Sequence, residues 1–266
     1  MLRPSPGLLC AALLAGAVGP LHADMPEVQK RGALRVLVMP DTRRPEFFAL
    51  GPGAEPGFDQ ELLAGFCKLH RLRLEPVAVS AWDALIPALA EERGDLIAGR
   101  FTATAARRKQ VEFTREVFPT RNVVITRKPH KAVTSIEGLR AEKVGTIKGT
   151  SMAEAIAAAG VPPGSVDDTL APGSFGEALK SGRVGAAVWG VESAIALQRE
   201  DPEIQLGAFL GPPGSLAWAV RKDEPALLAA LNEYVENTRK TPTWSRLVVK
   251  YFGDAAPEIL KKARAE

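Results

Sequence analysis

Two threonines and an arginine, Thr102, Thr104 and Arg107, form the group of residues in this 266-residue sequence that most clearly suggests chemistry. They follow the apolar run DLIAGRF, which is typical of a buried strand, so the hydroxyls lie at the carboxyl end of that strand, where open α/β sheets leave a ligand crevice. We expect Thr104 to cap the helix AARRKQ and to bring its free N–H groups beside Arg107. A guanidinium can bind both oxygens of a carboxylate, so the pattern predicts a small anion site.

The elements that position this group alternate between short apolar runs and helical patterns. LRVLVM is the first predicted strand, and a helix follows over residues 58–70, where apolar residues recur at helical spacing. A helix over residues 83–94 contains Pro87, which removes an internal hydrogen bond and should tighten its first turns. The alternation restarts after residue 119. It predicts an α/β fold with mostly parallel sheets flanked by helices.

The sequence resembles the family 3 extracellular solute-binding proteins, which are the amino-acid and polar-solute receptors of bacterial ABC importers. The resemblance covers nearly the whole chain after residue 32. The segments that carry it, besides the strand and helix above, are GALRVLV, GFDQELLAGFCKLHRLRLEPVAV, VGTIKGTSMAEAIAAAG, SGRVGAAV, LAWAVRKDEPALLAALNEYVENTRK and VVKYFG. Each segment alone is weakly specific, but their order and spacing together are hard to obtain by chance.

This resemblance implies a two-lobed periplasmic binding protein fold, in which each lobe is a mostly parallel sheet flanked by helices. Two extended hinge crossings, near residues 118–124 and 215–221, would link the lobes. Lobe 1 would contain residues 24–119 and 220–266, and lobe 2 would contain residues 120–219. A ligand would then lie in the cleft and be enclosed by hinge motion.

The resemblance also implies ligand contacts in lobe 1. It places Arg107 on a substrate carboxylate, with the Thr102 hydroxyl and the backbone around Arg100 helping, and it places Trp82 where an aromatic side chain stacks on the ligand. Without the resemblance, spacing alone favours a solvated helix charge for Arg107, beside Arg108 and Lys109, and Trp82 is equally a core residue at a helix start.

Across the cleft, Thr150 and Ser151 precede the helical run MAEAIAAA. Ser151 and Glu154 match a capping box, so we expect the Ser151 hydroxyl to cap this helix. The same helix start would present N–H groups and a hydroxyl, from Thr150 or Ser151, to the carboxylate that Arg107 holds. Capping and ligand contact therefore compete for one hydroxyl.

Two departures from the amino-acid-binding pattern bear on the ligand. Gly190 stands where those receptors carry an acidic residue that pairs with an α-ammonium group. Glu192 or Asp41 could replace it, although Glu192 is equally a first-turn helix residue favoured by the helix dipole.

The second departure is Arg100, which stands where the family usually has Gly, Ser or Asn. Arg100 and Arg44 would make the cleft more cationic, unless Arg44 is simply solvated. We therefore expect a ligand more negative than a simple α-amino acid, such as a dicarboxylate, a keto or hydroxy acid, or an acidic amino acid.

Export is indicated by residues 1–23, where the apolar run LLCAALLAGAV follows MLRPSPG and is too short to span a bilayer. We interpret this segment as a cleaved signal peptide and expect a periplasmic monomer. The 34 basic and 31 acidic residues are dispersed, which argues against nucleic-acid binding. No motif for a metal or cofactor site is present, so we expect neither.

Three functional classes are consistent with these residues. The first is a receptor that captures a small anionic or zwitterionic solute for the permease subunits of an ABC importer. The second is an enzyme that resembles periplasmic cyclohexadienyl dehydratases, with Glu192 as general acid. The third is an accessory or regulatory lobe like the amino-terminal module of certain membrane-bound lytic transglycosylases. Since the sequence ends soon after VVKYFG, we do not expect lytic activity itself.

Overall fold

The computed structural model describes residues 24–40, 47–51 and 53–265. The predicted signal peptide and two of the predicted site residues, Asp41 and Arg44, lie outside the described residues. Within the described ranges, no helix has the length and apolar character that a bilayer crossing requires.

Lobe 1 is built on a five-stranded mixed sheet in the order β2-β1-β3-β10-β4. β1 is parallel to β2 and β3, whereas β10, which arrives from the far end of the chain, is antiparallel to both of its neighbours. The strands are β1 (Ala33–Val38), β2 (Arg73–Ala78), β3 (Leu96–Ile97), β4 (Glu112–Phe113) and β10 (Ala219–Val220). The helices are α1 (Met25–Arg31), α2 (Phe58–His70), η1 (Trp82–Ala84), α3 (Leu85–Ala90), α4 (Ala105–Arg108) and α9 (Pro225–Lys240).

Lobe 2 has a second five-stranded mixed sheet in the order β7-β6-β8-β5-β9. β6 is parallel to β7 and β8, and β5 is antiparallel to β8 and β9. The strands are β5 (Phe118–Arg127), β6 (Val144–Gly145), β7 (Val166–Asp167), β8 (Ala186–Gly190) and β9 (Ile204–Leu216). The helices are α5 (Ile136–Arg140), α6 (Ser151–Ala158), η2 (Pro163–Ser165), α7 (Phe175–Lys180) and α8 (Val191–Glu200).

Two features of the helix that contains Pro87 follow from its sequence. Its first turn is the 3₁₀ turn η1, which agrees with the tightening expected from the proline. The helix ends at Ala90 rather than at Gly94, because Glu92 takes a positive φ of 57° and the Arg93 N–H bonds back to the Ala88 carbonyl.

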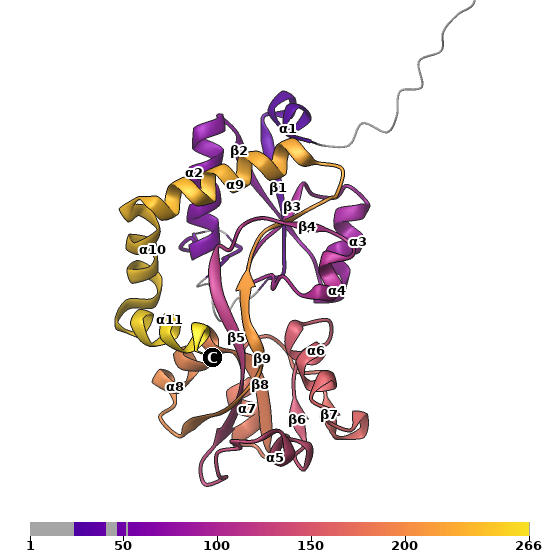
Figure 1. Ribbon diagram of the computed structural model, residues 1–266, viewed down its shortest axis with the longest axis vertical. Helices are drawn as coiled ribbons and strands as arrows, with labels where there is room; N and C mark the ends of the chain where they lie inside the picture. The colour runs from indigo at the N-terminus through magenta and orange to yellow at the C-terminus, as the bar shows by residue number, and fades with distance from the viewer. Residues whose placement is uncertain (1–23, 41–46, 52, 266) are drawn as a thin grey trace, which may run out of the picture.

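The two lobes are joined by β5 and the end of β9, which run side by side between them (Figure 1). Phe118 pairs with Leu216 where these strands leave lobe 1, and Leu216 also forms a bridge with Thr102. The crossings therefore lie where the sequence predicts them. The strands of each sheet group as expected, while the exact division into residues 24–119 with 220–266 and 120–219 stays a prediction.

An aromatic cluster packs against the hinge. Phe118, at the start of β5, lies 4.7 Å from Phe252 and 5.5 Å from Phe58 between ring centroids. Phe58 and Phe118 are fully buried, and Phe47 and Trp244 join the same cluster. Burial of several large rings here fixes the crossing strand to α2 and to the C-terminal helices.

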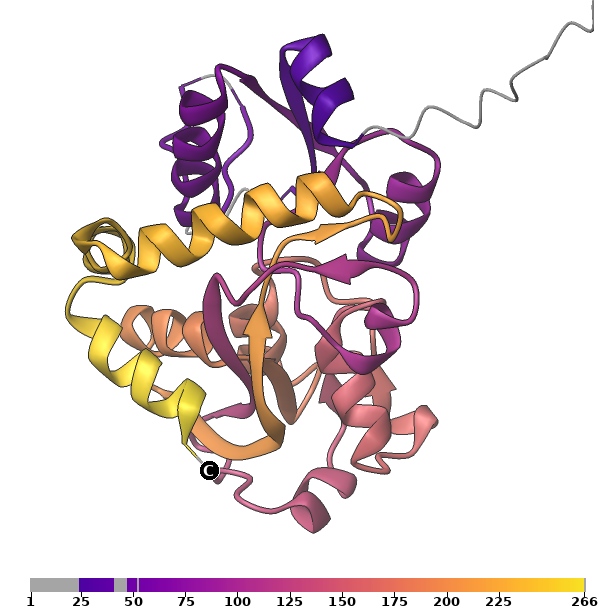
Figure 2. The same ribbon diagram turned by 45° about the horizontal axis from the view of Figure 1, so that its top comes forward.

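The C-terminal segment makes a third connection between the lobes, which the sequence reasoning did not identify. α10 (Pro242–Phe252) packs on α2 and α9, whereas α11 (Ala256–Arg264) packs on β5, α8 and β9 of lobe 2. Figures 1 and 2 show the two helices running along one side of the molecule from lobe 1 to lobe 2. Between them, η3 (Gly253–Ala255) turns the chain at Gly253, whose φ is 49°.

Candidate ligand-binding site between the lobes

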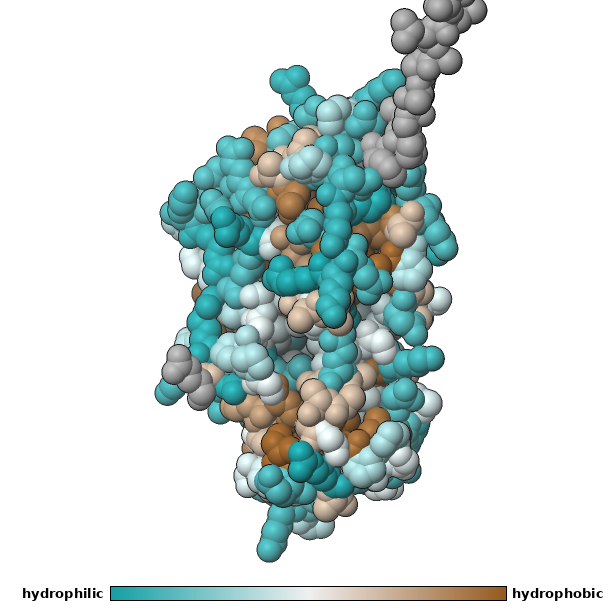
Figure 3. Space-filling view, turned by 45° about the vertical axis from the view of Figure 1, so that its right-hand side comes forward, coloured by the Kyte–Doolittle hydropathy of each residue, from teal (hydrophilic) through white to brown (hydrophobic). Residues whose placement is uncertain are grey.

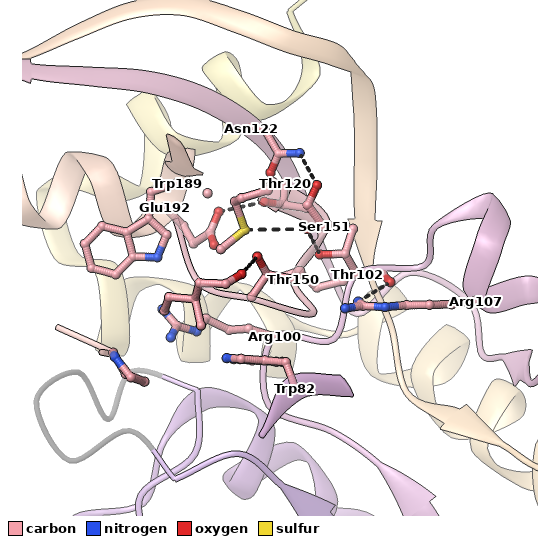
Figure 4. A pocket seen from close by; sticks show the side chains of 15 residues that line it. Trp82, Arg100, Thr102, Arg107, Thr120, Asn122, Thr150, Ser151, Trp189 and Glu192 are labelled. Carbon is pink, nitrogen blue, oxygen red and sulfur yellow. Dashed lines mark hydrogen bonds between the residues drawn. The ribbon is translucent and has the colours of Figure 1, made fainter. Parts of the chain in front are cut away.

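A small pocket lies between the two lobes, and residues from both of them form its walls (Figure 4). Seen from the side of α4 and α6, the lobes meet at a waist bordered by side chains of intermediate hydropathy (Figure 3). The space inside it is about 30 Å³, which is room for a water molecule or two but not for an amino acid. The predicted residues that line it are Trp82, Arg100, Thr102, Arg107, Thr150, Ser151, Gly190 and Glu192.

Arg107 is buried at the wall that lobe 1 contributes, with 6% of its surface exposed. Thr104 caps α4 as expected, because its hydroxyl accepts a hydrogen bond from the Arg107 N–H at 3.3 Å. The Arg107 guanidinium donates to the Thr102 carbonyl and, across the gap, to the Gly149 carbonyl, both at 2.9 Å. It also lies over the Phe101 ring at 4.0 Å. The alternative of a solvated helix charge is therefore wrong for Arg107, while its neighbour Arg108 is exposed.

The charge of Arg107 survives its burial. Burial lowers the pKa of Arg107 to about 10, and the negative charge of Glu154 opposes that shift. Arg107 is therefore a cation at neutral pH. In the part of the chain that the structure describes, both hydrogen bonds from its terminal nitrogens go to neutral carbonyl oxygens rather than to a carboxylate. A buried cation without a direct counter-ion favours an anionic ligand group.

Arg100 occupies a left-handed turn at the end of β3. Its φ is 64° and that of Gly99 is 80°, and the buried Asp59 carboxylate fixes the turn by accepting the Gly99 N–H at 2.8 Å. Burial raises the pKa of Asp59 to about 6, although the Gly99 hydrogen bond opposes the shift. From this turn the Arg100 side chain reaches lobe 2 and donates to the Ser193 hydroxyl at 2.6 Å.

Thr150, not Ser151, caps α6, so the predicted capping box is wrong. Gly149 turns the chain with a φ of 75°, and Thr150 then takes the extended conformation of an N-cap. The Thr150 hydroxyl accepts the Ala153 N–H at 3.3 Å. This leaves the Ser151 hydroxyl to donate to the Thr102 hydroxyl across the gap, at 3.0 Å. The Thr150 hydroxyl therefore caps the helix and the Ser151 hydroxyl contacts lobe 1, so capping and contact across the cleft do not compete for one hydroxyl.

Gly190 and Glu192 lie at the junction of β8 and α8. Gly190 ends the strand in extended conformation and is the N-cap of α8, and Glu192 is in the first turn of that helix. Glu192 is 5% exposed, and one of its carboxylate oxygens accepts the Thr120 hydroxyl at 2.8 Å. It is therefore both a first-turn helix residue and part of the pocket wall.

Two tryptophans line the pocket from opposite lobes. Trp82 is half-buried, packs against the core of lobe 1, and has an indole nitrogen without a hydrogen-bond partner among the described residues. Trp189 is buried and stacks on Phe175, with ring centroids 4.3 Å apart. Both the stacking and the core interpretations of Trp82 are thus consistent with its position.

The sequence reasoning missed part of the lining, and the signals for it were weak. Thr120 and Asn122 are two apart on β5, which places both on one face of the strand. Asn122 donates to the Ser151 carbonyl at 3.3 Å. Trp189 precedes Gly190 at the end of a buried strand, so its position in the sequence could have identified it. The other missed residues are Ile147, Met152, Pro172 and Leu216.

This geometry, with two α/β lobes joined by two strands and a polar pocket between them, is that of the two-lobed periplasmic binding protein fold. Residues 34–254 match the family model for bacterial extracellular solute-binding proteins, family 3. The chain therefore belongs to this family.

Solved structures support the same assignment. A mutant of ArgBP from T. maritima is 26% identical, has a TM-score of 0.77, and the likeness covers 86% of this chain and 99% of that one. An ancestral arginine-binding protein bound to arginine is 28% identical, with a TM-score of 0.73 and coverage of 84% and 99%. The ancestral amino acid-binding protein AncCDT-1, a precursor of cyclohexadienyl dehydratase, is 27% identical, with a TM-score of 0.74 and coverage of 85% and 98%.

Curated relatives carry two kinds of name. Membrane-bound lytic murein transglycosylase F of Pseudomonas putida (strain GB-1) is 25% identical over 91% of this chain and 50% of its own length. The chain thus spans about half the length of the curated relatives of this name. A probable amino-acid ABC transporter-binding protein of Haemophilus influenzae (strain ATCC 51907 / DSM 11121 / KW20 / Rd) is 25% identical over 76% of this chain and 77% of its own.

Proposed function

We propose that this protein is a periplasmic receptor that captures a small carboxylate-bearing solute and delivers it to the permease of an ABC importer. The observation that carries the proposal is the buried, charged guanidinium of Arg107, which lies in the pocket between two lobes of a family 3 fold. The amino-acid ABC transporter-binding relative supports the importer as partner.

The proposed site would hold one carboxylate from both sides. On lobe 1, Arg107 has five N–H donors, of which two are used by the Thr102 and Gly149 carbonyls. On lobe 2, the N-terminus of α6 contributes partial positive charge and the Ser151 hydroxyl. Since the cavity is too small for a solute while the lobes touch, we propose that they separate to admit it and close around it.

Binding measurements on Arg107→Lys test this proposal. A thermal-shift screen of amino acids and organic acids identifies a ligand, because a ligand at a hundredfold its Kd adds about 2.7 kcal/mol to the free energy of unfolding. Calorimetry should then show Arg107→Lys weakening that ligand by about 1.5 to 3 kcal/mol, since lysine cannot bind a carboxylate with two parallel hydrogen bonds.

Arg108→Lys is the matched control, because Arg108 lies on the same short helix but is exposed. Its affinity should equal that of the wild type. Equal affinity of Arg107→Lys and Arg108→Lys would refute the role of Arg107, and a screen without any ligand would refute the receptor function itself.

A second candidate function is dehydration, favoured by one observation: the Glu192 carboxyl group is buried in the pocket of a chain that is similar to a precursor of cyclohexadienyl dehydratase. Incubation with prephenate or arogenate separates the two functions, because only an enzyme would turn them over. An accessory role in the manner of the transglycosylase relatives predicts neither turnover nor importer-dependent uptake.

A further inference from the structure

The indole N–H group of Trp82 is a buried hydrogen-bond donor without an acceptor. Its Nε1 atom is shielded from solvent and forms no hydrogen bond with any of the described residues. An indole N–H group can only donate, and it usually finds an acceptor when it is buried. Because a buried donor that stays unpaired costs free energy, an unpaired one in a folded protein requires an explanation.

The position of Trp82 distinguishes it from the other buried polar atoms of this kind. Within the described part of the chain these are Asp59 Oδ1, Thr146 Oγ1 and Trp218 Nε1. These three residues are at most 3% exposed, and none of them lines the pocket. Trp82, in contrast, is half-buried and is one of the residues that form the pocket wall (Figure 4). Its unpaired donor is therefore the one of the four that a bound solute can reach.

Local structure places Trp82 where the two lobes meet. Trp82 begins the 3₁₀ turn η1, directly after the extended residue Ala81, and its side chain packs against the apolar core of lobe 1. The next residue of the turn, Asp83, touches lobe 2, because a Cβ atom added to Gly149 would lie 2.7 Å from the Asp83 backbone nitrogen. Closure of the lobes therefore brings lobe 2 against the turn that holds Trp82 and removes water from its indole group.

We propose that the Trp82 N–H group is a specificity-determining donor, which selects solutes that carry an oxygen acceptor in addition to the carboxylate bound by Arg107. The inference rests on the proposed receptor function and narrows its ligand class. Dicarboxylates, keto and hydroxy acids, and amino acids with a carboxylate or amide side chain meet this requirement. Solutes that end in an alkyl, ammonium or guanidinium group do not.

The selection acts mainly through the penalty on a solute of the wrong kind. While the lobes are apart, water accepts the hydrogen bond from Trp82, and a bound solute takes the place of that water on closure. An oxygen of the solute replaces the lost bond, whereas an alkyl group leaves the donor buried and unpaired. An ammonium or guanidinium group brings a second donor instead of an acceptor. Arg100, which lines the same pocket, is likewise a donor only.

The test compares solutes that share a carboxylate and a chain length but differ at the far end. Calorimetry with the wild-type protein measures succinate against butyrate and asparagine against leucine, with arginine and lysine beside them. In at least one pair, we expect the oxygen-bearing solute to bind at least about 10-fold more tightly than its alkyl partner, and also more tightly than arginine or lysine. Tightest binding of an alkyl or cationic solute would overturn the inference but leave the receptor function intact. No binding of any of these solutes would count against both.

Trp82→Phe then attributes the preference to the N–H group, because phenylalanine keeps an aromatic face but has no donor. It should reduce the ratio of the two affinities in the discriminated pair by about 10-fold and leave the alkyl solute nearly unchanged. An equal loss for both solutes would show that the ring acts by packing alone, which would overturn the assignment. Trp244→Phe is the matched control, since Trp244 does not line the pocket, and it should not change the ratio.

A closer isostere keeps the experiment decisive if phenylalanine leaves a gap. At position 82 this is the tryptophan analogue in which sulfur replaces the N–H group, so that the size and shape of the ring are preserved. It should reduce the ratio as Trp82→Phe does. Circular dichroism and thermal unfolding verify that each variant folds. If the protein with this analogue discriminates within the pair as the wild type does, the Trp82 N–H group does not select the ligand.

Discussion

At the scale of single residues, the two lobes approach each other closely at Gly149. A Cβ atom there would lie 2.7 Å from the backbone nitrogen of Asp83 in lobe 1, and the φ of Gly149 is 75°. Its carbonyl also accepts the cross-lobe hydrogen bond from Arg107. We expect Gly149→Ala to hold the lobes apart at this point and to weaken ligand binding by about 1 to 3 kcal/mol, which is a typical cost of overpacking. Calorimetry with the ligand found by the screen measures the change.

Gly182→Ala provides a control with the same backbone strain but no clash. Gly182 has a φ of 70°, and a Cβ atom added to it would meet nothing within 4 Å. Alanine there should therefore cost about 1 kcal/mol of folding stability and no affinity. If both variants bind the ligand equally well, contact at Gly149 does not limit closure.

At the scale of elements, α11 couples the end of the chain to lobe 2. Ile259 is 1% exposed, and Arg264 pairs at 2.6 Å with Glu116, which also accepts hydrogen bonds from Ser215 and from Arg239 on α9. Because these ion pairs are partly exposed, the packing of α11 should contribute more than they do. We expect Ile259→Ala to lower the free energy of unfolding by about 2 to 4 kcal/mol, as measured by denaturant unfolding.

The matched substitution for that helix is Lys261→Ala, since Lys261 is exposed on the same helix. It should change the free energy of unfolding by less than about 0.5 kcal/mol. Equal, small effects of the two substitutions would mean that α11 is not held by its apolar face, and that the third connection between the lobes contributes little.

Some of the elements and their contacts can be predicted from the sequence, and others cannot. Strands and helices that pair with sequence neighbours, such as β1 with β2, follow from apolar periodicity, and the Thr104 cap follows from local chemistry. Contacts between segments that are far apart in the sequence do not follow from such local patterns. Nothing local indicates that α11 packs on α8, and Ser151 and Thr150 are equally good caps until the turn at Gly149 selects one of them.

Some residues of the candidate site can likewise be predicted from the sequence, and others cannot. Arg107 and Ser151 are predictable because the family resemblance fixes their register, and both line the pocket. The sequence indicates a missing acidic residue at Gly190, but only the fold shows that the Glu192 carboxylate lies in the space next to it. Side-chain direction within one helical turn depends on neighbours such as Thr120, which comes from a strand 72 positions away.

At the scale of the whole molecule, direct hydrogen bonds join the lobes across the pocket, including those from Arg107 to Gly149, from Ser151 to Thr102 and from Arg100 to Ser193. The described residues thus form a closed arrangement that leaves about 30 Å³ of cavity. If the lobes must separate for a solute to enter, a covalent bond across the gap should block exchange.

We choose the pair Thr102 and Ser151 for such a bond, because their hydroxyl oxygens lie 3.0 Å apart across the gap, and the two sulfurs of a disulfide lie about 2 Å apart. In the double variant Thr102→Cys with Ser151→Cys, oxidation should stop ligand added afterwards from binding, and reduction should restore binding. Cys67 is buried, which limits competing disulfides. Stopped-flow binding with the oxidised and reduced protein measures the effect, with Thr102→Cys alone as control. Thiol titration verifies that the oxidised protein is cross-linked. Equal association rates of the oxidised and reduced protein would then mean that the pocket fills without lobe separation.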